Sequence, residues 1–398
     1  MSTYPNPAFS TPTLRLVSSS STSNTATFER PIEIPFSPAN HPVTIVGSGN
    51  SGLALSSYLA QQGYRVHLLA RSLDKIASLK ENMAVKSIGK VEGQFELAAV
   101  TSSPVESVAK SRTIFIATVT TVYAEIARML APHLQDGQEI VLFSSKFAGS
   151  VEFTKALAQC GIDCKKRNIT IIETDALFAC RIQEDNSIWI RGFKDWTLFS
   201  APTRSQTEAG RKIIQRFFPR LEKADNIIQR GLTDFGAVAH TITMLANMNQ
   251  VDRAQPFLFY HEGFTERTIK LMEKLETEFR FVAEAYGTTL IPMPELLNRY
   301  YGCDTSSLYN ALRTVPNYRH SQAPMELHHR YIIEDVSCSH VPIQGLARKA
   351  GLSTPVLDSV VCFAETLLDI DFAAEGRNLS KLGWADLSRD EIVVQIHS

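Results

Sequence analysis

Short apolar runs alternate with segments of helical period along the first half of the chain. Runs rich in β-branched residues predict strands at 42–46, 64–69, 114–118, 139–143, 169–172, 189–191 and 196–200. Apolar residues recur at the 3.6-residue spacing of a helix in the segments around 53–59, 121–134 and 151–160. Strands and helices that alternate in this way predict an open, mainly parallel sheet with helices on both faces.

A glycine-rich turn joins the first predicted strand to the first predicted helix. In such a turn one glycine allows a tight bend, the next lets the backbone approach a pyrophosphate, and the last lets helix and strand pack closely. Strand, turn, helix and second strand together occupy about 30 residues, the length of a mononucleotide-binding βαβ unit. A glycine-rich turn without a ligand is the less favoured alternative. The segment predicts a Rossmann domain that binds a dinucleotide through Gly47, Ser48, Gly49, Asn50 and Gly52.

Beyond Pro202 the pattern is helical. Periodic segments run through 206–217, 231–250, 264–286, 293–301, 343–350 and 355–369, and we predict no strand among them. We therefore expect two domains, a doubly wound Rossmann sheet over 41–201 and an all-helical substrate domain over 202–398. The reaction would take place in the cleft between them, which we expect to open and close.

Residues 1–40 differ from both predicted domains. Ser and Thr fill 14 of these 40 positions, together with six Pro and no Lys. Such a composition cannot bury enough apolar surface to offset the entropy lost on ordering, which predicts a disordered tail. An organelle transit peptide is the alternative, although six prolines disfavour the amphipathic helix that it would need.

The overall composition is that of an ordinary globular protein. Hydrophobic residues make up 44% and charged residues 20%, and 40 basic side chains almost balance 41 acidic ones. We therefore expect no binding to nucleic acid or to an anionic membrane, and no apolar run is long enough to span a bilayer. The six cysteines form no CxxC pair and no zinc-like set, so we expect reduced thiols, no metal and a cytoplasmic protein. A monomer and a homodimer fit this composition equally well.

The end of the second predicted strand indicates which nicotinamide cofactor is used. An NAD-binding unit usually carries Asp or Glu there, which holds the ribose 2′-hydroxyl. Here Arg71 and Ser72 follow the strand and no acid is present. Because a guanidinium and a hydroxyl can donate to a 2′-phosphate, these residues predict a preference for NADP over NAD. Alternatively, Ser72 caps the helix that begins at Leu73, and Arg71 is a solvated surface charge.

Five segments of the second half of the chain share a recognisable pattern. They are ETDxxxACR over 173–181, His240 followed by Asn247, FYxxG over 259–263, HRYxxEDV over 329–336, and the C-terminal GRNLxKLG segment over 376–383. This pattern resembles the octopine/nopaline dehydrogenase family, which joins a Rossmann domain to a helical domain. The resemblance covers roughly 43–385. It departs from the family pattern at Asp234 and Gly236, where Asn is common, and over 337–340, where an aromatic-glycine sequence is common.

The resemblance implies an opine dehydrogenase. In that reaction the α-amine of an amino acid condenses with a 2-oxo acid such as pyruvate or 2-oxoglutarate, and NAD(P)H reduces the imine. It implies that His240 is the acid–base group, that Asp335 orients its ring, and that Arg330 binds the oxo-acid carboxylate. Without the resemblance, His240 would be an ordinary core residue, Asp335 a surface carboxylate, and Arg330 half of an exposed pair with Glu334.

Further substrate contacts follow from position in the predicted fold. Ligands of an open α/β sheet bind beyond the carboxyl ends of its strands, so Thr118 and Ser144 are predicted to face the substrate or nicotinamide, unless they cap helices. Asn247 lies about two helical turns from His240 and either binds substrate or satisfies a buried carbonyl. Two other functions stay open: a ketopantoate-type 2-oxo-acid reductase, which needs no amine, and a non-catalytic NADP-binding regulator.

Overall fold

The computed structural model describes residues 37–398, without the side chain of Lys75. Most of the predicted tail lies outside the described residues. Its last residues do form structure, because Pro38–Asn40 make a short 3₁₀ helix, η1, just before the first strand.

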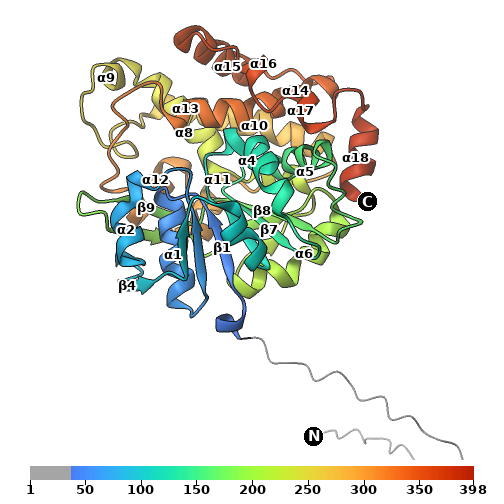
Figure 1. Ribbon diagram of the computed structural model, residues 1–398. Helices are drawn as coiled ribbons and strands as arrows, with labels where there is room; N and C mark the ends of the chain where they lie inside the picture. Colours follow the sequence, from blue (N-terminus) through green and yellow to red (C-terminus); the bar gives the residue numbers. More distant parts are fainter. Residues whose placement is uncertain (1–36) are drawn as a thin grey trace, which may run out of the picture. The chain divides into compact units, whose positions relative to one another are not determined.

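An eight-stranded sheet forms one layer of the molecule, in the order β12-β11-β8-β7-β6-β1-β2-β5 (Figure 1). Its strands are β1 (Val43–Val46), β2 (Val66–Leu69), β5 (Ala99–Thr101), β6 (Thr113–Ile116), β7 (Glu139–Phe143), β8 (Thr170–Thr174), β11 (Leu198–Ser200) and β12 (Glu222–Lys223). Each pair of neighbours in the part of the sheet ordered β8-β7-β6-β1-β2-β5 is parallel, and β11 runs antiparallel to β8. The predicted fold class, a Rossmann sheet followed by a helical domain, is confirmed.

Helices cover both faces of this sheet, as expected for strands that are apolar on both sides. Phe115 of β6 packs in one core together with α1 (Asn50–Gln61) and α6 (Arg204–Phe217). Its neighbour Ile114 points to the opposite face, where α4 (Tyr123–Leu130) and α5 (Gly149–Gln159) supply the core. Short connecting elements complete the layer: η2 (Asp74–Ile76), α2 (Ala77–Asn82), α3 (Pro104–Ser107), η3 (Val108–Lys110), η4 (Thr120–Val122) and η5 (Ala131–His133).

A second, four-stranded sheet was not foreseen from the sequence. It consists of β4 (Gly93–Glu96), β3 (Ala84–Gly89), β10 (Ile188–Phe193) and β9 (Phe178–Ile182), in that order. The β10 strand was predicted, but it belongs to this sheet rather than to the large one. The small sheet lies against α1, so it flanks the glycine-rich turn at which α1 begins.

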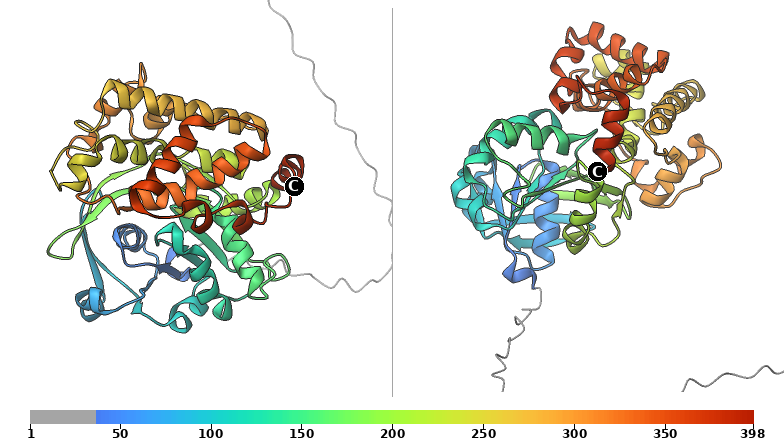
Figure 2. Two further views of the ribbon diagram at one scale, coloured as in Figure 1. Left: turned by 90° about the horizontal axis from the view of Figure 1, so that it is seen from above. Right: turned by 90° about the vertical axis from the view of Figure 1, so that its right-hand side faces the viewer.

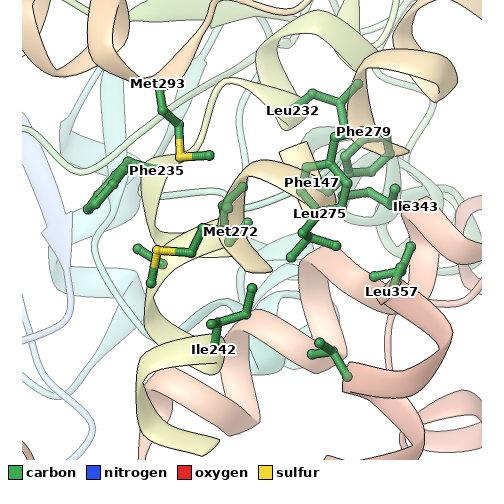
Figure 3. Close-up of a cluster of buried hydrophobic side chains, with 14 of the residues drawn as sticks. Phe147, Leu232, Phe235, Ile242, Met272, Leu275, Phe279, Met293, Ile343 and Leu357 are labelled. Atoms are coloured by element: carbon green, nitrogen blue, oxygen red, sulfur yellow. The ribbon is translucent and has the colours of Figure 1, made fainter. Parts of the chain in front are cut away.

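The remaining helices surround a second large core, shown in part in Figure 3. They are α7 (Ile227–Leu232), α8 (Phe235–Ala246), α9 (Met248–Asp252), α10 (Glu266–Ala285), α11 (Met293–Tyr301), α12 (Leu308–Thr314), η6 (Pro316–Tyr318), α13 (Arg330–Asp335), the π-helix η7 (Val336–His340), α14 (Val341–Lys349), α15 (Pro355–Leu368), α16 (Phe372–Glu375), α17 (Leu379–Leu382) and α18 (Arg389–His397). Figure 2 shows this helical layer beside the sheet. Within residues 37–398, no helix is both long and apolar enough to cross a membrane.

The two layers do not divide at residue 202, where the helical pattern begins. The first helix after that point, α6, packs on β8 and β11, and the last strand of the large sheet ends at Lys223. The amphipathic pattern of α6 shows that one face is covered but not by which layer, and a two-residue strand leaves no periodic signal. Phe147, from the loop after β7, packs with Leu275 and Phe279 in the helical core, so the layers interlock (Figure 3).

Candidate active site

The glycine-rich turn has the geometry that a pyrophosphate requires. Gly47 has a φ of +116°, and a Cβ there would lie 2.6 Å from the carbonyl oxygen of Ala117. A Cβ on Gly52 would lie 1.9 Å from the carbonyl oxygen of Gly47, so helix and strand could not approach as they do. At Gly49 a Cβ would meet nothing within 4 Å, which leaves this side of the turn open. The α1 helix begins at Asn50, and its first N–H groups suit an anion at that point.

The other residues predicted to bind the cofactor lie around this turn. Ser48 is half-buried within it, whereas the side-chain oxygen of Asn50 accepts a hydrogen bond from the backbone N–H of Ile182, at 2.8 Å. Asn50 therefore ties the turn to the small sheet. Arg71 is exposed and Ser72 half-buried just beyond β2, and neither side chain has a hydrogen bond or ion pair among the described residues. Ser72 does not cap a helix there, because η2 has no side-chain cap.

His240 and Asp335 come together, although 95 residues separate them in the sequence. The ring of His240, on α8, has its Nδ1 atom 2.9 Å from Oδ2 of Asp335, at the end of α13. Asp234 caps α8 by accepting a hydrogen bond from the N–H of Gly236. A Cβ on Gly236 would lie 2.8 Å from the His240 ring, so glycine makes room for the imidazole. The two departures from the family pattern before His240 thus have structural roles in this chain.

Lys146 is a buried member of this group that sequence reasoning missed. It lies in the loop after β7, its Nζ atom is 3.0 Å from Oδ2 of Asp234, and it also pairs with Asp335. Burial alone would lower the pKa of Lys146, but the two carboxylates raise it above its usual range. Burial would likewise raise the pKa of Asp335, but Lys146 and His240 hold it well below its usual range. His240 therefore faces a permanently charged carboxylate. The available signal was a single lysine after a fully buried strand.

Aromatic side chains enclose the imidazole of His240. The ring of Tyr331 stacks on it with centroids 3.9 Å apart and planes 12° apart. The hydroxyl of Tyr260 lies 3.4 Å from Nε2, the ring nitrogen that Asp335 does not engage. Burial raises the pKa of Tyr260 well above its usual value, so the hydroxyl stays protonated at neutral pH. The Nε2 atom is consequently the one at which a substrate could exchange a proton with His240.

Arg330 lies at the first residue of α13. The helix starts there because His329 accepts a hydrogen bond from the N–H of Tyr331. Burial and the charge of Arg330 lower the pKa of His329 to about 4, which keeps its ring neutral and able to accept. The Nε atom of Arg330 is 3.1 Å from Glu334, so the ordinary i,i+4 pair does form. The Arg330 side chain is still 46% exposed, and no described residue hydrogen-bonds to its two terminal nitrogens.

The remaining predicted substrate contacts are less directly placed. Thr118 donates a hydrogen bond to the carbonyl of Val119, and Ser144 accepts one on its carbonyl oxygen from the hydroxyl of Tyr123. Ser144 has a φ of +87°, so the chain turns sharply after β7. Asn247 ends α8 and donates its amide N–H groups to the carbonyls of Thr243 and Gly263. Those bonds match the structural alternative for Asn247, whereas Thr118 and Ser144 do line the carboxyl edge of the sheet.

The unusual sequence over 337–340 forms the π-helix that follows Asp335. His340 is fully buried there, with Nε2 2.5 Å from the carbonyl oxygen of Ala237, so it joins this segment to α8. Among the described residues, no group of three or more His, Cys, Asp or Glu side chains could hold a metal ion.

Buried polar contacts fix the strand-end loops to the helices. Arg377 donates from one terminal nitrogen to the carbonyls of Ser145 and Phe147, both at 2.9 Å. Its Nε atom is 2.7 Å from Glu152 of α5. Glu334 accepts a hydrogen bond from the N–H of Thr120 in the loop after β6. These contacts hold the α13 segment, which carries Asp335, against the edge of the sheet where the cofactor is expected.

Comparison with known proteins shows which families this chain resembles. Residues 223–368 match the family model described as NAD/NADP octopine/nopaline dehydrogenase, alpha-helical domain, and residues 43–144 match the model of ketopantoate reductase PanE/ApbA. An opine dehydrogenase of Arthrobacter sp. (strain 1C) is 29% identical over 346 residues, which cover 86% of this chain and 95% of that protein.

Solved structures agree with the sequence comparison. A structure of octopine dehydrogenase with NADH and L-arginine has a TM-score of 0.70 at 20% identity, covering 89% of this chain and 98% of the other. Yersinopine dehydrogenase with NADP⁺ bound has a TM-score of 0.65 at 14% identity, covering 90% and 98%. The resemblance to the octopine/nopaline dehydrogenase family inferred from the sequence is confirmed.

Proposed function

We propose that this chain is an opine dehydrogenase that reduces, with NAD(P)H, the imine formed between an amino acid and a 2-oxo acid. The observation that carries the proposal is the arrangement of His240, bound to Asp335 on one ring nitrogen and facing only the hydroxyl of Tyr260, at 3.4 Å, on the other. This pair lies on helices held against the carboxyl edge of a sheet whose glycine turn fits a dinucleotide. The chain is accordingly an oxidoreductase of the class that acts on CH–NH bonds.

The residues of the chain supply acid–base chemistry. A protonated His240 would donate from Nε2 to the oxygen of the oxo acid, which leaves as water when the imine forms. Asp335 would stabilise the imidazolium and hold Nδ1–H, as in other His–carboxylate pairs. Lys146 keeps Asp335 ionised, and the stacked ring of Tyr331 shields one face of the imidazole. When bound, the nicotinamide supplies the hydride.

Substrate and cofactor contacts extend this proposal. The half-exposed guanidinium of Arg330 would bind the oxo-acid carboxylate with its two terminal nitrogens. Thr118 and Ser144 would face the nicotinamide side of the site, and the side-chain oxygen of Asn247 would complete it. Gly47, Ser48, Gly49 and Gly52 would surround the pyrophosphate, with Asn50 at the helix start.

NADPH oxidation by the purified chain tests the proposal. Pyruvate and 2-oxoglutarate are each crossed with amino acids and with a control that lacks an amine. We expect oxidation that requires both an oxo acid and an amine, and a fall of about 10²–10⁴ in rate for His240→Ala. His133→Ala, in η5 before the amino end of β7 and so away from the carboxyl edge of the sheet, is the matched control and should retain the wild-type rate. Equal oxidation without amine would instead indicate a 2-oxo-acid reductase, a function favoured by the ketopantoate reductase match over 43–144.

A further inference from the structure

The acidic side chains around His240 already have cationic partners within the chain. The pairs are Glu173 with Arg230, Asp175 with Lys194, Asp234 and Asp335 with Lys146, and Glu334 with Arg330. Glu262, the other acid that could face the helical side of the site, is exposed and accepts a hydrogen bond from the N–H of Leu258. The paired carboxylates are not left to bind an ammonium or guanidinium group of a substrate, because that would break an existing ion pair, and most of these pairs are buried.

Arg191 of β10, by contrast, is a cation without an acidic partner among the described residues. It forms no ion pair with any described residue, and its Nε atom is buried without a hydrogen-bond partner. One terminal nitrogen donates to the hydroxyl of Ser321 at 3.3 Å, and the guanidinium lies 5.7 Å from the centre of the Trp189 ring. A buried guanidinium N–H without an acceptor is costly unless a ligand supplies one.

Arg191 lies close to the aromatic side chains that surround His240, namely Phe259, Tyr260 and Tyr331. The carbonyl of Ser321, its hydrogen-bond partner, accepts a bond from the N–H of Phe259 at 2.8 Å. The ring of Phe259 is in turn 5.2 Å from that of Tyr331, which stacks on His240. Burial raises the pKa of Tyr260, Tyr301 and Tyr331, and the positive charge of Arg191 opposes this effect at all three.

Cys180 of β9 lies close to Arg191, because Cys180 pairs with Ile190, the residue before Arg191. Burial raises the pKa of the Cys180 thiol to about 12, and the charges of both Arg330 and Arg191 oppose that shift. Beside Arg191 is a pocket of about 250 Å³, which contains further basic groups and no acid. It is lined by Gly89, Lys90, Trp189, Ile190, Arg191, Pro316, Asn317 and His320. Cationic groups without acids form an environment that suits an anion.

We propose that Arg191 binds the α-carboxylate of the amine substrate, and that this substrate is an amino acid with an uncharged side chain. The inference rests on the proposed function, in which two carboxylates meet at one imine. If Arg330 binds the carboxylate of the oxo acid, the α-carboxylate of the amino acid needs a cation of its own, because the two negative charges repel each other. An uncharged side chain fits because the acids near His240 are paired and the side chains beside it are the packed rings of Phe259, Tyr260 and Tyr318.

The first experiment compares amines with the wild-type chain, pyruvate and NADPH. Leucine and 3-methylbutan-1-amine differ only by the carboxylate, and lysine and arginine carry a cationic side chain. We expect kcat/KM for leucine to exceed that for the decarboxylated amine and for both cationic amino acids by at least about tenfold. Higher kcat/KM values for lysine or arginine would overturn the uncharged-side-chain class.

The second experiment removes the guanidinium. Arg191→Met should raise KM for leucine about tenfold or more, leave KM for pyruvate and NADPH near wild-type values, and abolish the preference for leucine over its decarboxylated amine. Arg191→Lys should restore part of that preference. The control Arg65→Met, at an exposed position just before β2 of the large sheet, should leave all three KM values and the preference unchanged. NADPH fluorescence titration shows that each variant remains folded.

The outcomes separate this inference from the proposed function. An unchanged KM for leucine in Arg191→Met, or a raised KM for pyruvate instead, overturns the role of Arg191 alone. A wild-type chain that binds NADPH but shows no amine-dependent oxidation overturns the proposed function and this inference with it.

Discussion

At the scale of single residues, Lys146 links the loop after β7 to the His240–Asp335 pair. It is 8% exposed and compensates the charges of Asp234 and Asp335, which lie on separate helices. Removal of one partner from a buried ionic group typically costs about 3–5 kcal/mol, because the remaining charge is left without compensation. We expect Lys146→Met to lower the free energy of unfolding by about that amount, measured by urea denaturation at pH 7. Lys212→Met, at an exposed position, should have no such effect.

The same substitution should change the pH dependence of stability. The folded-state pKa of Asp335 is depressed. Ionised Asp335 therefore stabilises the fold at pH values above its unfolded-state pKa of about 3.9. This stabilisation is lost as the pH falls below that value towards the folded-state pKa. Without Lys146 the folded-state pKa of Asp335 should rise. Urea denaturation from pH 3 to pH 7 should then show less acid-dependent loss of stability than in the wild type. An unchanged pH dependence would mean that Lys146 does not hold Asp335 ionised.

Arg71 is the residue that should decide between the two nicotinamide cofactors. It is exposed just beyond β2, where an acid would hold the ribose 2′-hydroxyl in an NAD-binding unit. We expect Arg71→Ala to raise KM for NADPH about tenfold, the loss of a charge-assisted hydrogen bond, and to leave KM for NADH unchanged. A ratio of NADPH to NADH affinities that already favours NADH, or that the substitution does not alter, would contradict the preference for NADP.

At the scale of elements, one buried arginine fixes the loop between β7 and α5. This loop contains three residues with positive φ, Ser144, Lys146 and Ala148. Arg377 is 1% exposed and donates to two carbonyls of the same loop while it pairs with Glu152. A left-handed backbone at a residue with a side chain is unfavourable and persists only where the surroundings hold it.

Removal of that arginine should therefore destabilise the chain strongly. We expect Arg377→Met to lower the free energy of unfolding by about 3–5 kcal/mol, since Glu152 and the loop carbonyls lose their buried partner. Arg389→Met, on the exposed side of α18, is the matched control. Urea denaturation measures both, and equal stabilities would show that the loop does not depend on Arg377.

At the scale of the whole molecule, buried polar contacts join the sheet to the helices on several sides. Lys146, the Arg230–Glu173 pair, and the bond from the N–H of Thr120 to Glu334 all link the two layers. Wide opening of the cleft, expected from two-substrate chemistry alone, would expose these charges or separate their partners. We therefore expect the radius of gyration from small-angle scattering to change little when NADPH and pyruvate are added. A marked decrease would show that the layers close on the ligands.

The order of elements was largely readable from the sequence, because strands buried on both faces are continuous apolar runs. The same reasoning missed β3, β4, β5, β9 and β12. The small sheet is half-exposed, with mixed polar residues such as Lys86 and Gln94, and its pairing joins residues about a hundred positions apart in sequence. No local pattern carries that information.

The sequence by itself determined the glycine turn, the alternating sheet and the family pattern around His240 and Asp335, because each depends on residue type at fixed local spacing. Only the tertiary structure placed Lys146 between Asp234 and Asp335, Tyr331 against His240, and Arg191 without an acidic partner. The physical reason is that charge compensation and stacking depend on distances between remote segments. Whether a buried charge is already paired, and thus unable to bind a substrate, is set by packing.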